Sequence, residues 1–551
     1  VISSSKGVLV PRLTDTEIQA ISSPAVGLIV YNLTQHIPVF YDGTNWCRFN
    51  GMILGYDFPD GAIFVSPNGS DASGNGSMQS PFRTIGCAID SAINAGSNDI
   101  IVANGVYNET VEMEDGVNLY GGYDANTWKR NLGATQTIIS GDGTLDGHSV
   151  TVIASNISLS TVLEGFVIYG PNSNNPDHNS YGIYSYSPGS NLEILNNVVY
   201  AGDGAPGSDG INGANGATGV DGGGRDDNQD AYDGFITAGS PCNDSNNRQY
   251  SNGGVLIVGS YNISGGNGGG NSCAPVYDTE SSGTDGQNGG GGGGGSGIGG
   301  LGGDAGDDGR YALNNCYLPT QPYYGQNGNH GTYGDNGSGG TGGSNTSGTV
   351  VSSHWKASAG SDGSNGGNGG GGGGGGAGGG GECESMCTAD RLGGHGGGGG
   401  SGGGGGEAGA HGNGGGGSFA IFIINGAAPV ITNNTIYLGN AGPGGNGGTG
   451  GAGGSGGQGG NGGLSPATWE CYFDAGDGGN GGWGGHGGGG GGGCGGNAYG
   501  ICTYNVSGSP DYASGNTFSG GLAGTGGNGG FSPGSSGTSG SSGVVQNCSY
   551  N

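Results

Sequence analysis

Glycine recurs at every third position through long parts of this chain. The clearest case runs from Pro443 to Gly463 and reads PGG NGG TGG AGG SGG QGG NGG without a break. The same phase is kept in tracts at 204–222, 325–343, 360–381, 394–415 and 476–491, and in shorter tracts at 283–295, 297–309, 521–530 and 534–543. A flexible linker has no physical reason to keep phase, whereas period three is the repeat of the extended polyproline-II type of helix. The tracts are therefore predicted to be ordered rods that lie side by side.

A residue without Cβ at every third position lets one such rod approach the backbone of another. Because this helix has no internal hydrogen bonds, its N–H and C=O groups must bond between neighbouring rods. Ordering a residue costs on the order of 1–2 kcal/mol, most for glycine, so a single rod is expected to melt and a bundle to be stable. In the 443–463 tract the glycines expected at rod contacts are Gly444, Gly447, Gly450, Gly453, Gly456, Gly459 and Gly462.

Collagen and disorder are the two other interpretations of 150 glycines in 551 residues. Collagen needs about 15–20 % proline in one long repeat, whereas the 19 prolines here are scattered. Disorder is the common state of segments rich in Gly, Ser and Asn, and it stays open for individual tracts. The kept phase and the short apolar segments between tracts favour the ordered bundle.

The formal charge of −31, from 11 basic and 42 acidic residues, limits the partners. Nucleic acids are bound through basic residues, so no nucleic-acid partner is expected, and an anionic membrane surface is disfavoured for the same reason. No segment approaches the ~18 apolar residues of a membrane span, so no membrane insertion is expected. Ca²⁺ fits this charge better, although the acidic clusters match no known calcium loop. The Ca²⁺ candidates are Asp226, Asp227, Asp304, Asp307 and Asp308, and no other cofactor is predicted.

The chain has eleven cysteines and few apolar residues, so covalent cross-links between cysteines would stabilise it. The cysteines indicate disulfides formed in an oxidising, extracellular setting. The expected pairs are Cys383–Cys387, Cys494–Cys502, and pairing among Cys242, Cys273 and Cys316. The spacing of Cys383 and Cys387 is also that of a metal site, but no second Cys or His pair accompanies it. The odd count leaves one thiol free or bonded to another subunit.

Residues 1–58 have ordinary glycine content and are predicted to form a small β module. Apolar strand segments at 28–31 and 38–41 precede an Asp42-Gly43 turn that closes a hairpin. The segments KGVLVPRLT (6–14), PAVGLIVYN (24–32) and YDGTNW (41–46) resemble a module of surface proteins from Bacteroidetes-type bacteria and of some phage tail-fibre proteins. The resemblance implies a capping or linking domain, or a docking unit that joins a fibre or a neighbouring subunit.

Residues 59–200 indicate a second architecture. Apolar residues at helical spacing (Ile85, Ala88, Ile89, Ala92 and Ile93) predict an amphipathic helix, which is followed by short strands broken by Asn-Gly, Asp-Gly and Gly-Gly turns. The stretch from SPFRTI (80–85) to GGYD (121–124) resembles the start of right-handed parallel β-helix proteins of the pectate-lyase-like superfamily. The resemblance implies that the helix caps the first rung and that one apolar strand repeats from rung to rung.

Matching strands tie this spine to the glycine tracts of residues 201–551. The segments LEILNNVVY (192–200) and VITNNTIY (430–437) are alike, each is followed at once by a tract, and SGNTF (514–518) is a degenerate third copy. The predicted fold class is all-β: a right-handed parallel β-helix with long glycine-rich excursions packed as a polyglycine-II helix bundle. Rungs about 4.8 Å apart would hold the excursions in line. The Asn-Asn pairs at 196–197 and 433–434 are predicted to stack as an asparagine ladder in the turns.

Catalysis is not indicated by any group of residues. β-Helix proteins include polysaccharide lyases, which need a basic residue over a carboxylate-bound Ca²⁺, and glycosidases, which need two carboxylates about 5–9.5 Å apart. No basic residue follows a rung strand in the company of acids. Asp142 and Asp146 form a candidate carboxylate pair, but Asp-Gly turns are ordinary corners. His148 and His178 are interpreted as isolated, and His354, beside a tract, as a surface residue.

Aromatic residues gather in the non-repeating segments between tracts. Such segments at rod ends predict either a sugar- or protein-binding tip or plugs that cover the bundle ends. The tip candidates are Tyr323, Tyr324, Trp355, Trp469 and Tyr472. Glycine-rich rod bundles resemble the adhesin tips of long-tailed phages and certain antifreeze proteins, and the mixed X residues of these triplets argue against a flat ice-binding face.

These features predict a non-enzymatic structural or adhesive protein, extracellular or at the cell surface. Open strand edges at both ends of a β-helix must be capped or joined to another chain, so self-assembly into a fibre, filament or sheath is expected. The alternatives are a β-helix polysaccharide lyase or glycoside hydrolase, and a phage-type receptor-binding adhesin. Predicted partners are copies of the same chain and, in the adhesive case, cell-surface glycans.

Overall fold

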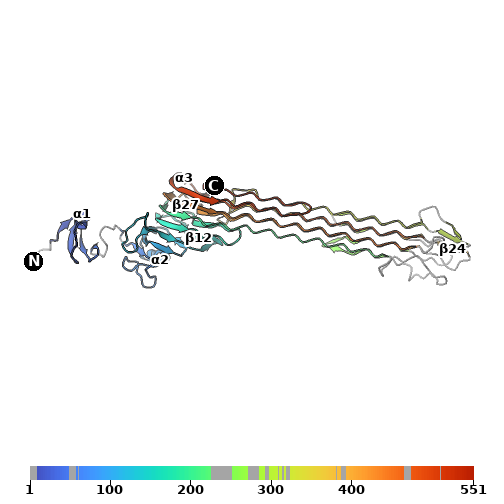
Figure 1. Cartoon of the computed structure of the whole chain (residues 1–551), viewed down its shortest axis with the longest axis horizontal. Coiled ribbons are helices and arrows are strands. Elements are labelled where there is room, and N and C mark those ends of the chain that lie inside the picture. The colour runs from blue at the N-terminus through green and yellow to red at the C-terminus, as the bar shows by residue number, and fades with distance from the viewer. Residues whose placement is uncertain are drawn as a thin grey trace.

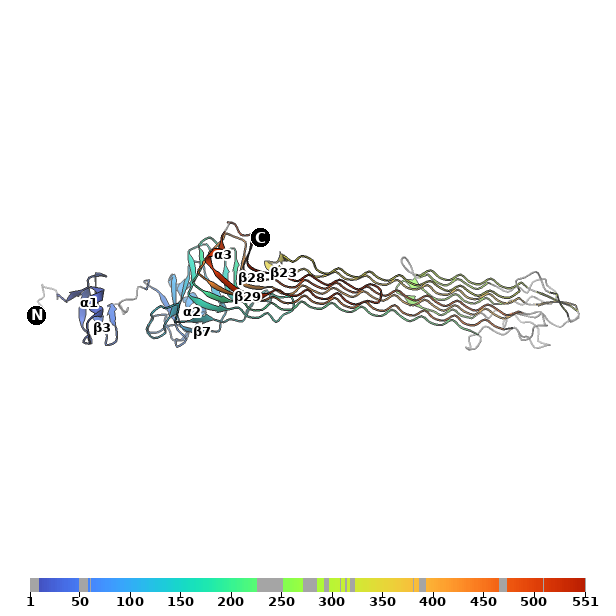
Figure 2. The ribbon, with the colours of Figure 1, turned by 45° about the horizontal axis from the view of Figure 1, so that its top comes forward.

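The structure, a computed structural model, shows three parts along one long axis (Figure 1). A small N-terminal β module is followed by a β-helix and then by a long bundle of extended rods, while the C-terminus returns to the β-helix (Figure 2). The residues that the structure describes are 9–48, 58–59, 61–224, 251–270, 285–291, 297–307, 309–312, 315–317, 323–379, 381–385, 393–464, 473–508 and 510–550.

The N-terminal module is a four-stranded sheet in the order β1 (Arg12–Leu13), β2 (Ile29–Asn32), β3 (Ile37–Tyr41) and β4 (Trp46–Arg48), with the short helix α1 (Asp15–Gln19). Thr14 caps α1 and forms a capping box with Glu17, which satisfies N–H groups that the first turn leaves open. The predicted Asp42-Gly43 turn closes the antiparallel hairpin of β3 and β4, where the Asp42 carboxylate accepts hydrogen bonds from the N–H groups of Thr44 and Asn45. The predicted strand segments at 28–31 and 38–41 pair antiparallel as β2 and β3.

From Ile63 onward the chain coils through three parallel sheets, one strand in each per turn. The first sheet holds β5 (Ile63–Val65), β6 (Asp99–Ala103), β9 (Asn118–Tyr123), β13 (Thr161–Glu164), β16 (Leu192–Leu195) and β26 (Val430–Thr432). The second holds β7 (Gly105–Tyr107), β10 (Thr137–Ile139), β14 (Phe166–Tyr169), β17 (Val198–Tyr200), β27 (Thr435–Asn440) and β29 (Thr517–Leu522). The third holds β8 (Val111–Met113), β12 (His148–Ser155), β15 (Ser180–Tyr186), β25 (Ser418–Ile424), β28 (Ala498–Tyr504) and β30 (Val545–Tyr550), with β11 (Gly143–Leu145) antiparallel to β12. The predicted parallel β-helix is therefore present.

Inward side chains of successive rungs stack in rows that form one core. In the first sheet Leu119, Leu163, Ile194 and Ile431 lie directly opposite one another, and the first three are fully buried. Each such side chain contributes about 1.5–3 kcal/mol by leaving water. The helix α2 (Ile85–Ala95) covers the first rung as predicted, although Ile93 is 52 % exposed and lies off its buried face.

The predicted asparagine ladder is confirmed and has a third member. The Asn434 Oδ1 accepts a hydrogen bond from the N–H of Asn197 at 2.9 Å, and the Asn434 Nδ2 donates to the Oδ1 of Asn516 at 2.9 Å. The residues before the first two members, Asn196 and Asn433, have φ of 53° and 57°, a left-handed conformation that Asn tolerates. The ladder therefore fixes the corner between the first and second sheets.

Replacing Asn434 with alanine is expected to lower the free energy of unfolding by about 3 kcal/mol. The change removes the acceptor of the buried Asn197 N–H and one of the two acceptors of the Asn197 side-chain amide. An unsatisfied buried polar group costs about 1–3 kcal/mol. Denaturant unfolding of the variant measures this loss. The exposed Asn191, whose amide donates to the carbonyl of Ser158, is the matched control, and an equal loss in Asn191→Ala would contradict the ladder's role.

The rods leave and rejoin the β-helix at one corner, between the second and third sheets. They depart after β17, β27 and β29 and return into β25, β28 and β30. The long rods are 201–224, 323–345, 357–379, 393–417, 441–464 and 473–497, and the shorter ones are 251–256, 263–270, 285–291, 297–307, 523–530 and 535–543. Small elements interrupt them: β18 (Ile257–Val258), β19 (Tyr261–Asn262), β20 (Gly309–Ala312), β21 (Asn315–Tyr317), β22 (Thr349–Val351), β23 (His354–Lys356) and β24 (Gly381–Ser385). The short helix α3 (Tyr512–Gly515) lies on the β-helix, between β28 and β29.

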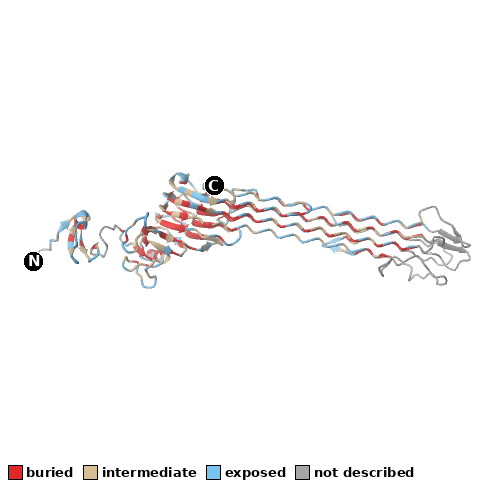
Figure 3. Cartoon of the chain, in the orientation of Figure 1, coloured by how far each residue is buried: buried red, intermediate tan, exposed pale blue. Residues whose placement is uncertain are grey.

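Backbone hydrogen bonds join the rods to one another with a period of three residues. In the 473–497 rod, Gly481 and Gly484 donate to carbonyls of the 441–464 rod at 2.9 Å, whereas Gly482 and Gly485 donate to the 357–379 rod at 2.8 Å. Successive glycines thus face different neighbours. The bonding runs between rods, as expected for extended chains that have no internal hydrogen bonds. Buried residues continue from the β-helix along the rods (Figure 3).

The register of the rungs carries on into the rods. In the second sheet Val198 of β17 lies opposite Thr435 of β27. Beyond these strands, Asp209 still accepts a hydrogen bond from the N–H of Asn446, at the same offset of 237 positions. The coiled sheet therefore sets the alignment that the rods need for their mutual hydrogen bonds.

The glycines of the 441–464 rod lie at contacts that a side chain would fill. A Cβ built on any of the seven predicted contact glycines would lie 1.9–2.5 Å from a backbone oxygen: Gly444, Gly447, Gly450, Gly453, Gly456, Gly459 and Gly462. The second glycine of each triplet is equally confined, with Gly445, Gly448 and Gly451 at 1.9–2.1 Å from carbonyls of the 201–224 rod. Both glycines of X-Gly-Gly are needed because each faces a different rod.

Candidate functional site

The distal end of the bundle carries a small aromatic cluster. The ring of Tyr323 stacks on that of Phe473 at 4.7 Å, and Tyr324 lies edge-on to Phe473 at 5.4 Å. Tyr324 is 53 % exposed. Two of the predicted tip aromatics, Tyr323 and Tyr324, therefore lie together where their rods begin, and Trp469 and Tyr472 lie outside the described residues. A binding tip and a plug over the rod ends both remain predictions for this cluster.

The prediction that Trp355 belongs to this tip is wrong. Trp355 lies in the hairpin of β22 and β23 at the base of the bundle, where it is 3 % exposed and its ring meets that of Phe419 edge-on at 5.7 Å. Ser352 and Ser353, with φ of 49° and 68°, make the tight turn that folds this hairpin back onto the β-helix. The sequence alone did not show which end of each rod a loop occupies.

Three histidines meet at this base, so the interpretation of His148, His178 and His354 as isolated or surface residues is also wrong. The rings of His148 and His354 stack at 4.2 Å, and those of His148 and His178 lie 4.7 Å apart. The Nδ1 of His148 accepts a hydrogen bond from the Asn179 N–H at 2.8 Å, and the Nε2 of His354 lies 3.2 Å from the Asp146 carboxylate. Tyr181 and Tyr184 complete the surroundings. The group joins β12 to the β22–β23 hairpin.

Acidification is expected to weaken this junction. Burial, followed by the neighbouring His354 and His178, lowers the pKa of His148 from 6.5 to about 3, and burial lowers the pKa of His354. Stability is therefore complete above pH 6.5 and falls as the pH drops below that value, because the unfolded chain binds the proton first. Denaturant unfolding at about pH 5, compared with pH 7.5, should show a loss of about 1–2 kcal/mol after discounting for solvent screening. A His148→Asn variant, which keeps an acceptor for Asn179, should lose less; an equal loss would contradict this origin.

The predicted Cys494–Cys502 disulfide is wrong, because both thiols are free. The chain between them is extended, first as rod and then as β28, so eight residues span about 25 Å, whereas a disulfide needs Cα atoms within about 7 Å. Cys316 and Cys383 lie on β21 and β24, on opposite sides of β20. Cys242, Cys273 and Cys387 lie outside the described residues.

The Ca²⁺ candidates are only partly placed. Asp304 and Asp307 are exposed on the 297–307 rod, and Asp226, Asp227 and Asp308 lie outside the described residues. In the part of the chain that the structure describes, no three His, Cys, Asp or Glu side chains are grouped so that they could hold a metal ion. The described residues therefore give no support to a calcium site at Asp304 and Asp307.

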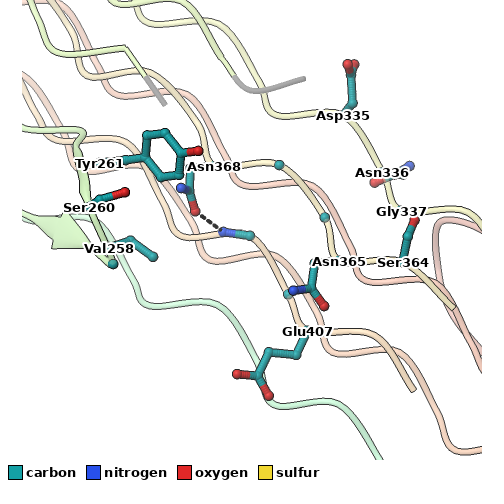
Figure 4. A pocket seen from close by; sticks show the side chains of 15 residues that line it. Val258, Ser260, Tyr261, Asp335, Asn336, Gly337, Ser364, Asn365, Asn368 and Glu407 are labelled. Carbon is teal, nitrogen blue, oxygen red and sulfur yellow. Dashed lines mark hydrogen bonds between the residues drawn. The ribbon is translucent and has the colours of Figure 1, made fainter. Parts of the chain in front are cut away.

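A groove of about 650 Å³, the hairpin groove, opens where the turn between β18 and β19 ends over three rods (Figure 4). Its floor keeps a regular pattern, because the side-chain oxygens of Asn368 and Asn365 accept hydrogen bonds from the N–H groups of Gly405 and Ala408 at 2.8 Å. Glu407 and Asp335 give its lining acidic side chains. Sequence reasoning did not find this groove, because it arises from a difference in rod length.

A second groove of about 380 Å³, the aromatic groove, lies among the 323–345, 441–464 and 473–497 rods. It is lined by His330, Gly331, Thr332, Tyr333, Gly456, Gln458, Asn480, Gly481 and Trp483. Tyr333 and Trp483 are 72 % and 55 % exposed. Both are non-glycine residues of the three-residue repeat. The sequence shows that these X positions hold mixed residue types, but it does not show which of them lie next to each other on adjacent rods.

Two family models match the N-terminal half of the chain. Residues 1–68 match a family model described as a phage tail-like trimerisation region, and residues 67–289 match a protein family of unknown function, DUF1565. No curated protein and no solved structure matches the chain. Among the described residues, no helix has the length and apolar character to cross a bilayer. The matches and the parallel sheets together support a phage-tail-like protein built on a β-helix, with self-association through its N-terminal region.

Proposed function

We propose that this protein is a non-enzymatic structural or adhesive fibre subunit, held in a trimer by its N-terminal module and projecting a stiff rod bundle. The observation that carries this proposal is the match of residues 1–68 to a trimerisation region of phage tail-like proteins. A trimer of such chains would present three bundles on one base, as a fibre or receptor-binding adhesin requires. An extracellular or cell-surface setting follows from this role.

We infer that the rods are polyglycine-II helices, and three of their features support this. They are extended, their glycines recur in threes, and their N–H groups bond to neighbouring rods at 2.7–3.1 Å along most of their length. A bundle of this kind resists bending because each rod is bonded to several others, and its surface offers X residues to a partner. Stiffness and display are what an adhesive or structural subunit needs from such a bundle.

The enzyme alternative finds little support in the charged residues of the β-helix. Arg130 lies 3.1 Å from Glu164 and stacks over Tyr120 and Tyr123, so this cation serves packing at a rung edge. Asp146, one of the candidate carboxylate pair, accepts a hydrogen bond from His354.

The mass and shape of the purified full chain test the proposed function. Analytical ultracentrifugation should give three times the mass of one chain, and negative-stain images should show thin straight projections from a thicker base. A chain that lacks residues 1–58 should sediment as a monomer with the same projections. A monomeric full-length protein, or one that depolymerises a polysaccharide, would contradict the proposal.

A further inference from the structure

Along one face of the 473–497 rod, side chains accept hydrogen bonds that the backbone carbonyls of a further rod would otherwise accept. Toward the β-helix, the hairpin of rods 523–530 and 535–543 covers this face, and Gly489 donates to the carbonyl of Ser535 at 3.0 Å. The hairpin turns at Phe531, which is 65 % exposed. Beyond this turn no described backbone covers this face of the 473–497 rod, and we call the uncovered strip the lane. Side-chain acceptors satisfy most of the N–H groups on its floor and walls.

Two ladders of side-chain acceptors fill this lane. On one side Asn327, His330 and Asn336 accept hydrogen bonds from the N–H groups of Asp477, Asn480 and His486 at 2.7–2.9 Å. On the other side Asp477, Asn480 and His486 accept from Gly462, Gly459 and Gly453 at 2.8–3.2 Å. The acceptors recur every third residue, so one residue is missing from each series.

The missing positions are Tyr333 and Trp483, and they coincide with the aromatic groove. Neither ring places an acceptor where the ladders need one. Consequently the N–H of Trp483 and that of Gly456 have no hydrogen-bond partner among the described residues. The side-chain amide of Gln458, on the opposite wall, likewise makes no hydrogen bond within the described chain. The residues that line the groove therefore carry two backbone donors and one side-chain amide that have no hydrogen-bond partner among the described residues.

The two aromatic side chains that line this groove are exposed to solvent. Gly334 donates to the carbonyl of Trp483 at 2.8 Å, so Tyr333 and Trp483 lie on adjacent rods. No described aromatic ring stacks on either of them, in contrast to the distal Tyr323 and Phe473. Exposed ring faces beside open donors suit a ligand with apolar C–H faces and hydroxyl or carbonyl oxygens.

We propose that the aromatic groove is a binding site for a neutral saccharide. A sugar ring stacks on Trp483 or Tyr333, and its oxygens accept hydrogen bonds from the N–H groups of Trp483 and Gly456 and from Gln458. No Asp, Glu, Lys or Arg lines the groove on a chain of formal charge −31, which favours an uncharged ligand over an acidic one. The volume of about 380 Å³ lies within the usual range of small-molecule sites. This inference rests on the adhesive form of the proposed function and gives it a ligand class and a place.

Isothermal titration of the full-length protein with mannotriose, tri-N-acetylchitotriose, maltotriose and sialyllactose tests the site. At least one of the three neutral sugars should bind saturably, with quenching of tryptophan fluorescence, and sialyllactose should not. The Trp483→Asn variant should bind about tenfold or more weakly, the loss expected when an aromatic anchor is removed. Its melting temperature should stay the same or rise, because asparagine supplies the acceptor that the Gly456 N–H lacks.

The matched control is Ile211→Asn, which changes an X residue that is 80 % exposed on the 201–224 rod and should leave binding unchanged. Absence of binding for all three neutral sugars, binding of sialyllactose alone, or equal binding by the Trp483→Asn variant would overturn the inference. A change in sedimentation with the Trp483→Asn variant would instead assign the groove to contact between chains and overturn it. The mass tests the proposed function independently of the groove. A protein that sediments as a trimer but binds no sugar would overturn the saccharide site and leave the proposed fibre subunit standing.

Discussion

The double variant Gly453→Val and Gly456→Val is expected to unfold the rod bundle while the β-helix stays folded. A Cβ at these positions would lie 1.9 and 2.0 Å from the carbonyl oxygens of Gly484 and Gly481, and the opposing atoms are backbone that cannot turn aside. We expect ~3 kcal/mol or more at each site, the upper end for overpacking a close contact. Limited proteolysis and thermal unfolding measure the result.

Thr449→Val is the matched control for this pair. Thr449 occupies an exposed X position of the same rod, and its replacement installs the same side chain at unchanged backbone contacts. Its melting temperature should stay close to that of the unaltered protein. If the double glycine variant has the same melting temperature as the Thr449→Val control, these glycines do not form close contacts between rods. The bundle would then not be stabilised by such contacts.

The second large effect is expected from the phase of the repeat. Inserting a single alanine after Asn446 moves every later X residue of the 441–464 rod onto a position that faces another backbone. Inserting the triplet Asn-Gly-Gly after Gly448 adds more chain but keeps the phase. We expect the single insertion to expose the bundle to protease and to lower its melting temperature sharply, and the triplet to cost little. Equal destabilisation by both insertions would show that the stability of the bundle does not depend on the three-residue phase of its glycines.

Much of the fold could be predicted because its periodicities are local. The helical spacing of Ile85, Ala88, Ile89 and Ala92 marks α2, and the repeated Asn-Asn corner marks the rungs at β16 and β26. The glycine phase predicted rods bonded through their backbones, and the named contact glycines lie where a side chain cannot fit. In each case a few consecutive residues carry the physical reason for the structure.

The errors concern partners far apart in the sequence. His148 and His354 stack although about 200 positions separate them, because the β22–β23 hairpin returns to the base. Cys494 and Cys502 are near in sequence but are held apart by an extended chain. The aromatic groove depends on Tyr333 and Trp483 lying on adjacent rods, at an offset of 150 positions that no local pattern encodes. Local patterns predict elements well and leave such long-range contacts open.

Hydrogen–deuterium exchange of the rod amides tests the central claim, that neighbouring main chains hold each other in order. Six glycine N–H groups of this segment donate to carbonyls of two flanking rods at 2.8–2.9 Å: those of Gly478, Gly479, Gly481, Gly482, Gly484 and Gly485. Bonded amides in a cooperative bundle exchange only when it opens. Peptides from residues 473–497 and 441–464 should therefore stay protected for hours in the native protein. Complete exchange of these peptides within seconds, as in an unstructured glycine-rich chain, would contradict the account.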